Sequence, residues 1–457
     1  MKKVELSENF TYGKLIVYAL PSILNMLVSI SFQMVDGYFV SNLLGVSAFA
    51  AVNLVMPLCV VMFALGLMFG TGSSAVAARY LGSGEEQKAR EIFSCAVVVM
   101  IAVGLILGGI LVLLMPTIGR MVGASVHSLD DCVIYGRWVA AFLFAFIITY
   151  GFQSLWVTAG KAWLGTVIAV INGAMNAVLD WVFMVPLKMG VTGAALATSL
   201  AALTGMIITL VYFARPNSSS LRLAIPKLRS FREMGAVCFN GASEMVDSVS
   251  GNLTQMVVNG QLMRFYGETG VAAMSVFGYI ASVFLSISYG FSNAIITIAG
   301  YKVGEKKKQE IHELLRRSTV LQILTGAVMG VLCWLLAKPI ATLYVGYDEA
   351  TLGLAVKVLK ISSVACLLYG FDTFCGAFFT GLGDGLGSII ISFTLSLAAP
   401  VVSVLLLPEV WGAEAIWYLY PVFTLATAIL CAGMLKWRYP AWMRQLEKNG
   451  WNVDTKD

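Results

Sequence analysis

The stretch FGTGSSAVAARYLGSGEEQKARE at residues 69–91 has a counterpart, YGFSNAIITIAGYKVGEKKKQEI, at residues 289–311. A shift of about 220 positions aligns Gly70 with Gly290 and Glu85 with Glu305. Two further pairs of similar segments follow almost the same shift: 150–153 with 369–372, and 193–194 with 412–413. Three similarities in one order indicate that the chain consists of two homologous halves.

The composition is that of a protein embedded in a bilayer. Hydrophobic residues make up 59% of the chain and charged residues 12%, with a mean hydropathy of +0.84, whereas soluble domains carry about 25% charged residues. These values exclude a water-soluble globular domain and a disordered chain. We expect the apolar run that begins near Lys14 to be the first membrane span, because it is too long for the apolar core of a signal peptide.

Apolar runs of about 20 residues cross a bilayer as helices, and the sequence predicts an all-α membrane protein with twelve of them. We place the spans near residues 14–40, 52–78, 92–116, 132–158, 164–186, 194–214, 236–264, 271–300, 316–340, 354–381, 386–408 and 414–436. The polar stretch from Arg215 to Arg232 divides them into six and six. The expected domains are an N-terminal six-helix bundle (1–214), a cytoplasmic linker (215–232), a C-terminal six-helix bundle (233–440) and a cytoplasmic tail (441–457).

The distribution of Lys and Arg predicts the orientation. Most of these residues lie in the N-terminal segment, the linker, the loops after the second and eighth spans, and the tail. Both termini are therefore expected in the cytoplasm, with the halves as parallel repeats. Duplicated apolar halves are typical of transporters with a substrate path between the halves. The basic linker could also bind anionic lipid, although topology alone explains its charge.

Several other functions find no support in the sequence. The eight Cys are scattered singly, and His127 and His312 fall in expected loops, so neither residue type forms a metal-ligand pattern. No phosphate-binding GxxxxGK[ST] motif and no nucleophile constellation is present. The net charge of +5 gives no sign of nucleic-acid binding, since the basic residues flank spans. We therefore expect no enzyme and no cofactor, and an ion gradient as the energy source for any uphill transport.

Carboxylates at membrane depth are the residues that need explaining, because each costs several kcal/mol unless it is paired, protonated or in a wet cavity. For Asp36 and Asp180 we favour a functional role over a structural one. Glu244 and Asp372 are evenly balanced between the two, since both fall early in their spans. Asp247, one turn after Glu244, is the weaker candidate.

The fifth span carries Asn172, Asn176 and Asp180 at i, i+4 and i+8, on one helix face. Such a face can bind a cation, or hold a carboxylic acid that loads and unloads a proton. Polar contacts between helices are the alternative, and for Asn172 we favour it. Gln33 is a candidate partner of Asp36, and Pro21 predicts a kink in the first span.

These residues together resemble the multidrug and toxic compound extrusion (MATE) family over nearly the whole chain. The resemblance rests on Pro21 through Gln33-Met-Val-Asp36, on the GSGE after span two, and on Asn176-Ala-Val-Leu-Asp180 followed by Gly190 through Thr198. It implies two bundles of six helices and export of organic cations and other xenobiotics, in exchange for H⁺ or Na⁺. The expected location is the bacterial plasma membrane, with small-molecule cargo, lipid neighbours and a monomeric state.

The resemblance also implies site residues. The family's N-lobe cation site corresponds here to Asp36, Asn176, Asp180 and Thr198, which is where Na⁺ would bind if it is the coupling ion. An alternative C-lobe site corresponds to Glu244 and Asp372, so the coupling lobe stays open. The competing hypothesis is a lipid-linked precursor flippase of the same superfamily. Flippases of that type line the cavity with basic residues for diphosphate, whereas the deep charges here are acidic.

Overall fold

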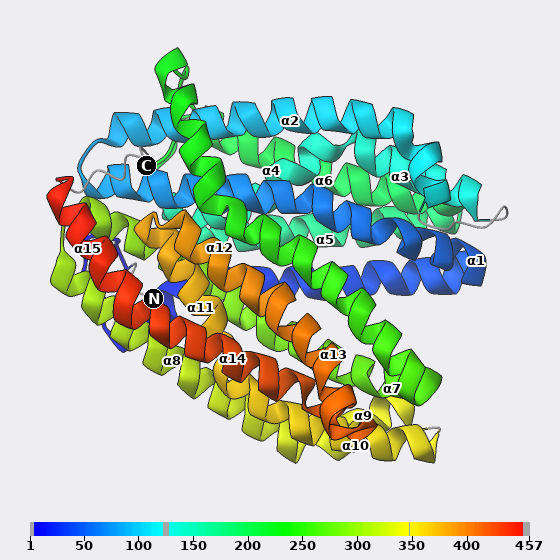
Figure 1. Ribbon diagram of the computed structural model, residues 1–457. Helices are drawn as coiled ribbons and strands as arrows, with labels where there is room; N and C mark the ends of the chain where they lie inside the picture. Colours follow the sequence, from blue (N-terminus) through cyan, green and yellow to red (C-terminus); the bar gives the residue numbers. More distant parts are fainter. Residues whose placement is uncertain (1–3, 122–127, 347, 451–457) are drawn as a thin grey trace. The chain divides into compact units, whose positions relative to one another are not determined.

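The computed structural model describes residues 4–121, 128–346 and 348–450, and in this part the regular structure is helical, with no strand (Figure 1). Within it, the side chains at 33, 38, 41–42 and 45–50 are not described. An apolar surrounding offers no hydrogen-bond partner to the backbone, and a helix satisfies its N–H and C=O groups internally. The all-α prediction is confirmed.

The longer helices follow one another along the whole chain. They are α1 (Tyr12–Gly82), α2 (Glu86–Met121), α3 (Leu129–Ala141), α4 (Leu143–Thr158), α5 (Ala162–Met184), α6 (Gly190–Ala214), α7 (Met234–Gly304), α8 (Lys308–Leu335), α9 (Ala337–Val345), α10 (Glu349–Ser362), α11 (Cys366–Leu382), α12 (Gly385–Phe393), α13 (Ala399–Trp411), α14 (Leu419–Gly433) and α15 (Tyr439–Lys448). The 3₁₀ segments η1 (Leu228–Glu233), η2 (Ser363–Ala365) and η4 (Ala413–Tyr418) and the π segments η3 (Thr394–Ala398) and η5 (Met434–Arg438) lie between them.

Two helices are too long to be single spans. Both α1 and α7 have 71 residues, which is about 106 Å at 1.5 Å per residue against a hydrocarbon core of about 30 Å. The ribbon of α1 doubles back near its label in Figure 1, and its apolar segments are Tyr12–Gly37 and Ala51–Gly82. In α7 the helix is interrupted at Gly267, where φ is 62° and ψ is −154°.

The number of spans agrees with the prediction once these breaks are considered. The described residues contain 10 helices long and apolar enough to cross a membrane, or up to 11 if α3 and α4 form one bent span. One of them, Leu228–Gly304, has two arms on either side of Gly267, which brings the structure to the twelve expected spans. The span expected at 132–158 corresponds to α3 and α4, which meet at a bend of 62°.

Contacts divide the chain into two compact units. The N-unit is Leu20–Gly241, and the C-unit combines Met1–Ala19 with Ala242–Asp457. The first residues of α1 therefore belong to the C-unit, and the first residues of α7 belong to the N-unit. No sequence pattern that we identified predicts this exchange.

In the N-unit, α5 packs along α6, and α2 packs against α3 and α4. The linker is attached to this bundle. Glu91 of α2, 5% exposed, forms an ion pair of 2.8 Å with Lys227 and accepts a hydrogen bond of 3.2 Å from Ser230. Tyr80 donates a hydrogen bond of 2.8 Å to Glu233. These contacts hold the start of α7 to the bundle of the N-unit.

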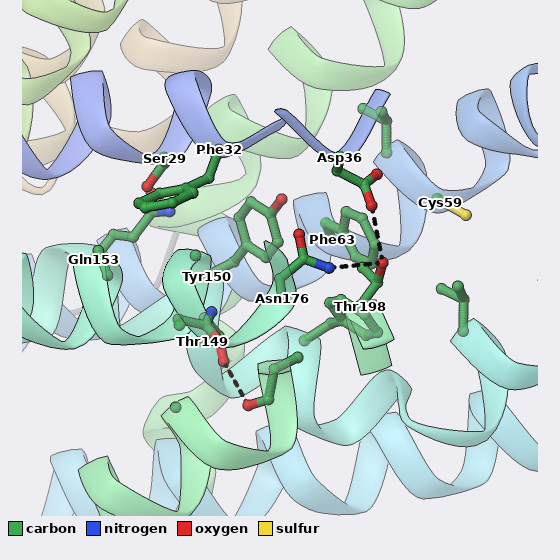
Figure 2. A pocket seen from close by; sticks show the side chains of 18 of the residues that line it. Ser29, Phe32, Asp36, Cys59, Phe63, Thr149, Tyr150, Gln153, Asn176 and Thr198 are labelled. Carbon is green, nitrogen blue, oxygen red and sulfur yellow. Dashed lines mark hydrogen bonds between the residues drawn. The ribbon is translucent and has the colours of Figure 1, made fainter. Parts of the chain in front are cut away.

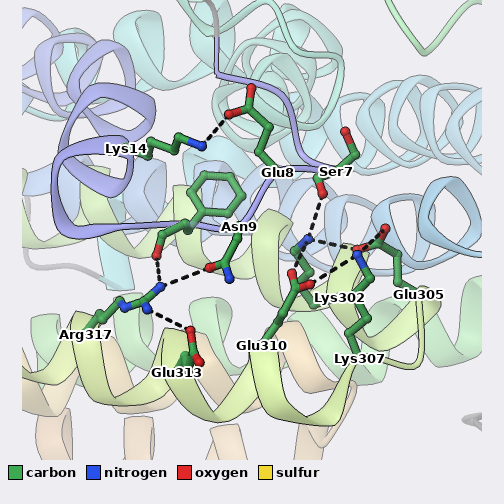
Figure 3. A network of polar contacts seen from close by, with 11 residues as sticks. Ser7, Glu8, Asn9, Lys14, Lys302, Glu305, Lys307, Glu310, Glu313 and Arg317 are labelled. Atoms are coloured by element: carbon green, nitrogen blue, oxygen red, sulfur yellow. Dashed lines mark hydrogen bonds and ion pairs between the residues drawn. The ribbon is translucent and has the colours of Figure 1, made fainter.

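In the C-unit a polar network holds the N-terminal segment (Figure 3). Lys302 is 1% exposed, donates to the carbonyl of Ser7 at 3.3 Å and pairs with Glu305 and Glu310 at 2.8 and 2.7 Å. Arg317 donates to the carbonyl of Phe10 and, at 3.0 Å, to Asn9 Oδ1. Hydrogen bonds to Glu310 and Glu305 also raise the pKa of Lys307, which lies between α7 and α8.

Glycines allow the closest helix contacts in the N-unit. A Cβ atom on Gly70 would lie 2.2 Å from the carbonyl oxygen of Gly151, so α1 and α4 touch backbone to backbone there. Both glycines belong to segments that repeat in the second half of the sequence. The repeat therefore includes residues needed for packing as well as residues with polar side chains.

We expect Gly70→Ala to lower the free energy of unfolding by roughly 1–3 kcal/mol, because the added methyl group meets a backbone that cannot move aside. Thermal unfolding of the purified protein in detergent measures the effect. Gly109→Ala in α2 is the control, since its Cβ would meet nothing within 4 Å, and it should be neutral or stabilising by up to about 1 kcal/mol. Equal shifts for both variants would contradict the packing argument.

Candidate functional site

Two contacts between α1 and α5 position the candidate residues of the N-unit. Thr166 donates a hydrogen bond of 2.7 Å to the carbonyl of Pro21. One turn before Asp36, the ring of Phe32 lies on Gly173, where a Cβ would come within 2.0 Å of the ring. Because Gly173 has no side chain, α1 can approach α5 closely enough to bring Asp36 beside Asn176.

A cavity of about 430 Å³ lies inside the N-unit, lined by residues of α1, α3, α4, α5 and α6. Among the described residues that line it, one is acidic, Asp36, and none is Lys or Arg. Three aromatic rings stack in the wall, with Phe63 at 4.7 Å from Phe146 and 4.9 Å from Tyr150 between ring centres. The cavity wall therefore combines apolar and aromatic side chains with amide and hydroxyl groups, such as those of Asn53, Gln153 and Asn172, and has negative charge available at Asp36.

Asp36, Thr198 and Asn176 form a hydrogen-bonded chain at the cavity wall (Figure 2). Thr198 Oγ1 donates to Asp36 Oδ1 at 3.4 Å and accepts from Asn176 Nδ2 at 3.3 Å. The same hydroxyl lies 3.0 Å from the carbonyl of Ala194. The structure thus brings together three predicted residues, from α1, α5 and α6, that are far apart in the sequence.

Asp180 lies next to these three hydrogen-bonded residues. It is fully buried and interacts electrostatically with Asp36. Its hydrogen-bond partner is the carboxyl group of Asp36, and among the described residues no amide, hydroxyl or basic group donates to its oxygens. A buried carboxylate without donors is unstable as a bare anion. The chemistry of this position therefore requires a proton on the acid or a bound cation.

The supporting residues occupy different places. Pro21 lies inside α1, and the side chain of Gln33 lies outside the described part of the chain. Asn172 lines the cavity and packs on Gly205. Its Oδ1 is buried without a hydrogen-bond partner in the described chain.

The C-unit contains a second acidic group, around a cavity of about 20 Å³. Glu244, Asp247 and Asp372 all line it, and it is large enough for about one water-sized occupant. Asp372 is fully buried beside the thiol of Cys431, and no amide, hydroxyl or basic group among the residues described donates to its oxygens. Glu244 interacts electrostatically with Asp247.

Asp247, the weaker candidate by sequence, has the most hydrogen-bond donors of these acids. Tyr289 and Ser396 both donate hydroxyl hydrogen bonds to its carboxylate. Neither partner was identified from the sequence, and Tyr135, which interacts with Asp36, Asp180 and Thr198 in the N-unit, was also missed. A tyrosine in an apolar run gives no signal, because 17 Tyr are spread over the chain.

Metal coordination by several acidic or sulfur ligands finds no support in the part of the chain described. No group of three or more His, Cys, Asp or Glu side chains is arranged there to hold a metal ion. The free cysteines, Cys59 among them, are mostly buried.

Comparison with known proteins gives a consistent result. A family model described as MatE matches residues 21–182 and 245–405, once in each half. The multidrug export protein MepA of Staphylococcus aureus (strain MRSA252) is 23% identical over 388 residues, 82% of each chain. MepA of Staphylococcus saprophyticus is 23% identical over 390 residues, with the same coverage.

Solved structures share the fold. A MATE in complex with MaL6 has a TM-score of 0.89 at 21% identity, covering 97% of this chain and 100% of that chain. A MOP superfamily transporter from Pyrococcus furiosus has a TM-score of 0.88 at 22% identity, covering 97% and 99%. The fold predicted from the sequence is confirmed.

We expect Tyr289→Phe to destabilise the protein by about 1–3 kcal/mol, because it leaves the buried carboxylate of Asp247 without one of its two hydroxyl donors. A thermal unfolding curve in detergent provides the measurement. Tyr279→Phe is the matched control on the same helix, since Tyr279 is 47% exposed and stacks on Tyr344. An unchanged melting temperature in Tyr289→Phe would show that the hydrogen bond contributes nothing.

Proposed function

Because this chain belongs to the MatE family, whose members are membrane transporters and not enzymes, we propose that it exports small organic molecules in exchange for a cation. The relatives that it matches are named multidrug export proteins, which supports a xenobiotic cargo. The proposed coupling ion is H⁺ or Na⁺, and the proposed site is Asp36, Asn176, Asp180 and Thr198. We further propose that both termini lie in the cytoplasm.

The observation that carries this proposal is the environment of Asp180. It is fully buried, no amide, hydroxyl or basic group of the described chain donates to its oxygens, and the group that it contacts is another carboxyl, that of Asp36. Two carboxylates side by side in an apolar interior cannot both remain bare anions. Loading of a proton or Na⁺ is therefore strongly favoured at this place.

Both coupling ions suit the groups present. Na⁺ is a hard cation that takes oxygen ligands, as Ca²⁺ and Mg²⁺ do, and Asp36, Thr198 and Asn176 all carry side-chain oxygens. A proton needs only one carboxyl to hold it, with the other as acceptor. In either case Thr198 fixes the position of Asp36 through its hydrogen bond.

Competition for Asp36 would couple the ion to the cargo. A cationic cargo in the cavity is attracted to ionised Asp36, and a cation bound at the acid pair removes that attraction. Cargo and ion then favour different states of the transporter, which is the differential binding that coupling requires. We propose that the two bundles rock to open the path alternately to each face.

The lining of the cavity supports a cationic cargo over a diphosphate. A flippase for lipid-linked precursors needs basic groups to hold phosphate, and the described lining has none. Aromatic residues of the lining, among them Phe32, Phe63 and Tyr150, can attract an organic cation through cation–π interaction. The acids of the C-unit, Glu244 and Asp372, are the alternative coupling site.

We expect Asp36→Asn and Asp180→Asn each to reduce ion-driven efflux of ethidium by about 5- to 150-fold, the range of typical coupling free energies of ~1–3 kcal/mol. Efflux is measured in energised cells or inverted vesicles, with Na⁺ varied at fixed pH and pH varied at fixed Na⁺. The ion whose gradient drives wild-type efflux is the coupling ion. Asp130→Asn is the control in the same unit, since Asp130 is exposed at the start of α3.

Glu244→Gln and Asp372→Asn test the other lobe in the same assay. If these variants lose efflux while Asp36→Asn and Asp180→Asn retain it, coupling belongs to the C-unit and the proposed N-unit site is wrong. If wild-type protein that is correctly inserted exports no cationic dye under either gradient, the cargo class is wrong.

A further inference from the structure

The end of α6 forms a groove of about 540 Å³ that is separate from the cavity described above. Its apolar wall includes Ile207 and Val211, and Arg215 lies at its end. These residues are spaced i, i+4 and i+8, so they form one stripe on one face. Because α6 is a candidate membrane span, the stripe leads from apolar surroundings to a cationic end.

The apolar part of the stripe is open to its surroundings. Ile207 is 49% exposed and Val211 is 42% exposed. Arg215, the C-cap of α6, follows Ile207 by eight positions, which corresponds to a rise of about 12 Å along the helix. The stripe is thus long enough to contact the upper part of one acyl chain.

Three basic side chains gather at the polar end of the groove. Arg215 lines it directly, and Lys161 donates a hydrogen bond of 2.8 Å to Ser218, another lining residue. Arg222 donates to the carbonyl of Asn217, which also lines the groove. Within the described residues none of the three basic side chains forms a salt bridge, in contrast to Lys227 of the same linker, which pairs with Glu91.

The surrounding sequence supplies no acid to neutralise this cluster. From residue 181 to residue 232 the chain contains no Asp or Glu, whereas the linker alone carries Arg215, Arg222, Lys227, Arg229 and Arg232. The acids at the linker are already engaged, Glu91 with Lys227 and Glu233 with Tyr80. A negative charge for Arg215, Lys161 and Arg222 is therefore expected from outside the chain. A headgroup phosphate suits Arg because its planar guanidinium donates two parallel hydrogen bonds.

We propose that this groove binds an anionic phospholipid, with the headgroup at Arg215, Lys161 and Arg222 and an acyl chain along Ile207 and Val211. The acyl wall distinguishes a lipid from a free phosphate, which would have no use for it. The proposal stands independently of the transport function, because none of these residues lines the cavity of the N-unit.

A second observation indicates that the linker meets lipid. Ile225 is 93% exposed and Leu228 is 86% exposed, and the basic residues Lys227 and Arg229 flank Leu228. Burial of an apolar side chain of this size is favourable by about 1.5–3 kcal/mol relative to exposure to water. Basic residues beside such side chains favour binding to an anionic membrane surface. Both features fit a segment that lies on the headgroup region.

The test uses native mass spectrometry of the purified full-length protein, titrated with phosphatidylglycerol and, separately, phosphatidylcholine. Wild-type protein should bind one phosphatidylglycerol more tightly than phosphatidylcholine, by about fivefold for each basic side chain that contributes. The double variant Lys161→Gln/Arg215→Gln should lose about 25-fold in affinity for phosphatidylglycerol. Its affinity for phosphatidylcholine should stay unchanged.

The control is Arg444→Gln/Lys448→Gln, which removes the same two residue types from exposed positions of α15. It should bind phosphatidylglycerol as wild type does. Val211→Trp keeps every charge and fills the apolar wall, and it should also weaken phosphatidylglycerol binding. Melting temperatures within the range of the control establish that each variant is folded.

Three results would overturn the proposal. The first is equal affinity of the wild type for the two lipids. The second is equal loss in the test and control double variants, which would mean diffuse charge attraction. The third is unchanged binding in Val211→Trp together with displacement of the lipid by inorganic phosphate, which would make the groove an anion site.

Discussion

The structure depends on one constraint, which is that polar groups in apolar surroundings must find partners within the protein. For the backbone the constraint is met by helices. Pro21 has no N–H to donate to the carbonyl one turn before it in α1, and Thr166 of α5 donates to the carbonyl of Pro21 itself. Gly267 interrupts α7 with a positive φ that other residues adopt only under strain.

For side chains the same constraint separates two kinds of buried acid. Asp384 accepts two hydrogen bonds from Arg438, at 2.6 and 2.7 Å, and caps the start of α12. It is satisfied as an anion and therefore structural. Asp180 and Asp372 are buried as deeply, but no amide, hydroxyl or basic group of the described chain donates to them, and their contacts are with Asp36 and Cys431. A change in their protonation would therefore change the electrostatic energy of the unit that contains them.

The sequence predicted the helices well, because they depend on periodicity. The polar residues of the N-unit stand out because such residues are rare in apolar runs, and their role as a site stays a prediction. Asn176 and Asp180 share a helix face by spacing alone, but their association with Asp36 and Thr198 came from family resemblance. Partners such as Tyr289 were missed, since a tyrosine in an apolar run carries no distinctive pattern. The 62° bend after Ala141 was missed because no Pro or Gly marks it. Tertiary packing determines it, and packing is not readable from one sequence.

The exchange of helix beginnings between the two units has a consequence for the origin of the chain. The segment up to Ala19 folds with the C-unit, and 234–241 of α7 folds with the N-unit, at corresponding positions of the repeat. In an ancestral protein with only one of the two halves, the first helical segment would have had no second bundle to pack against. Two copies would have satisfied each other by reciprocal exchange, as a domain-swapped dimer. Gene fusion would then have joined the end of one copy to the first segment of the other. A contact between two subunits would thereby have become the present contact between the linker and the bundle of the N-unit.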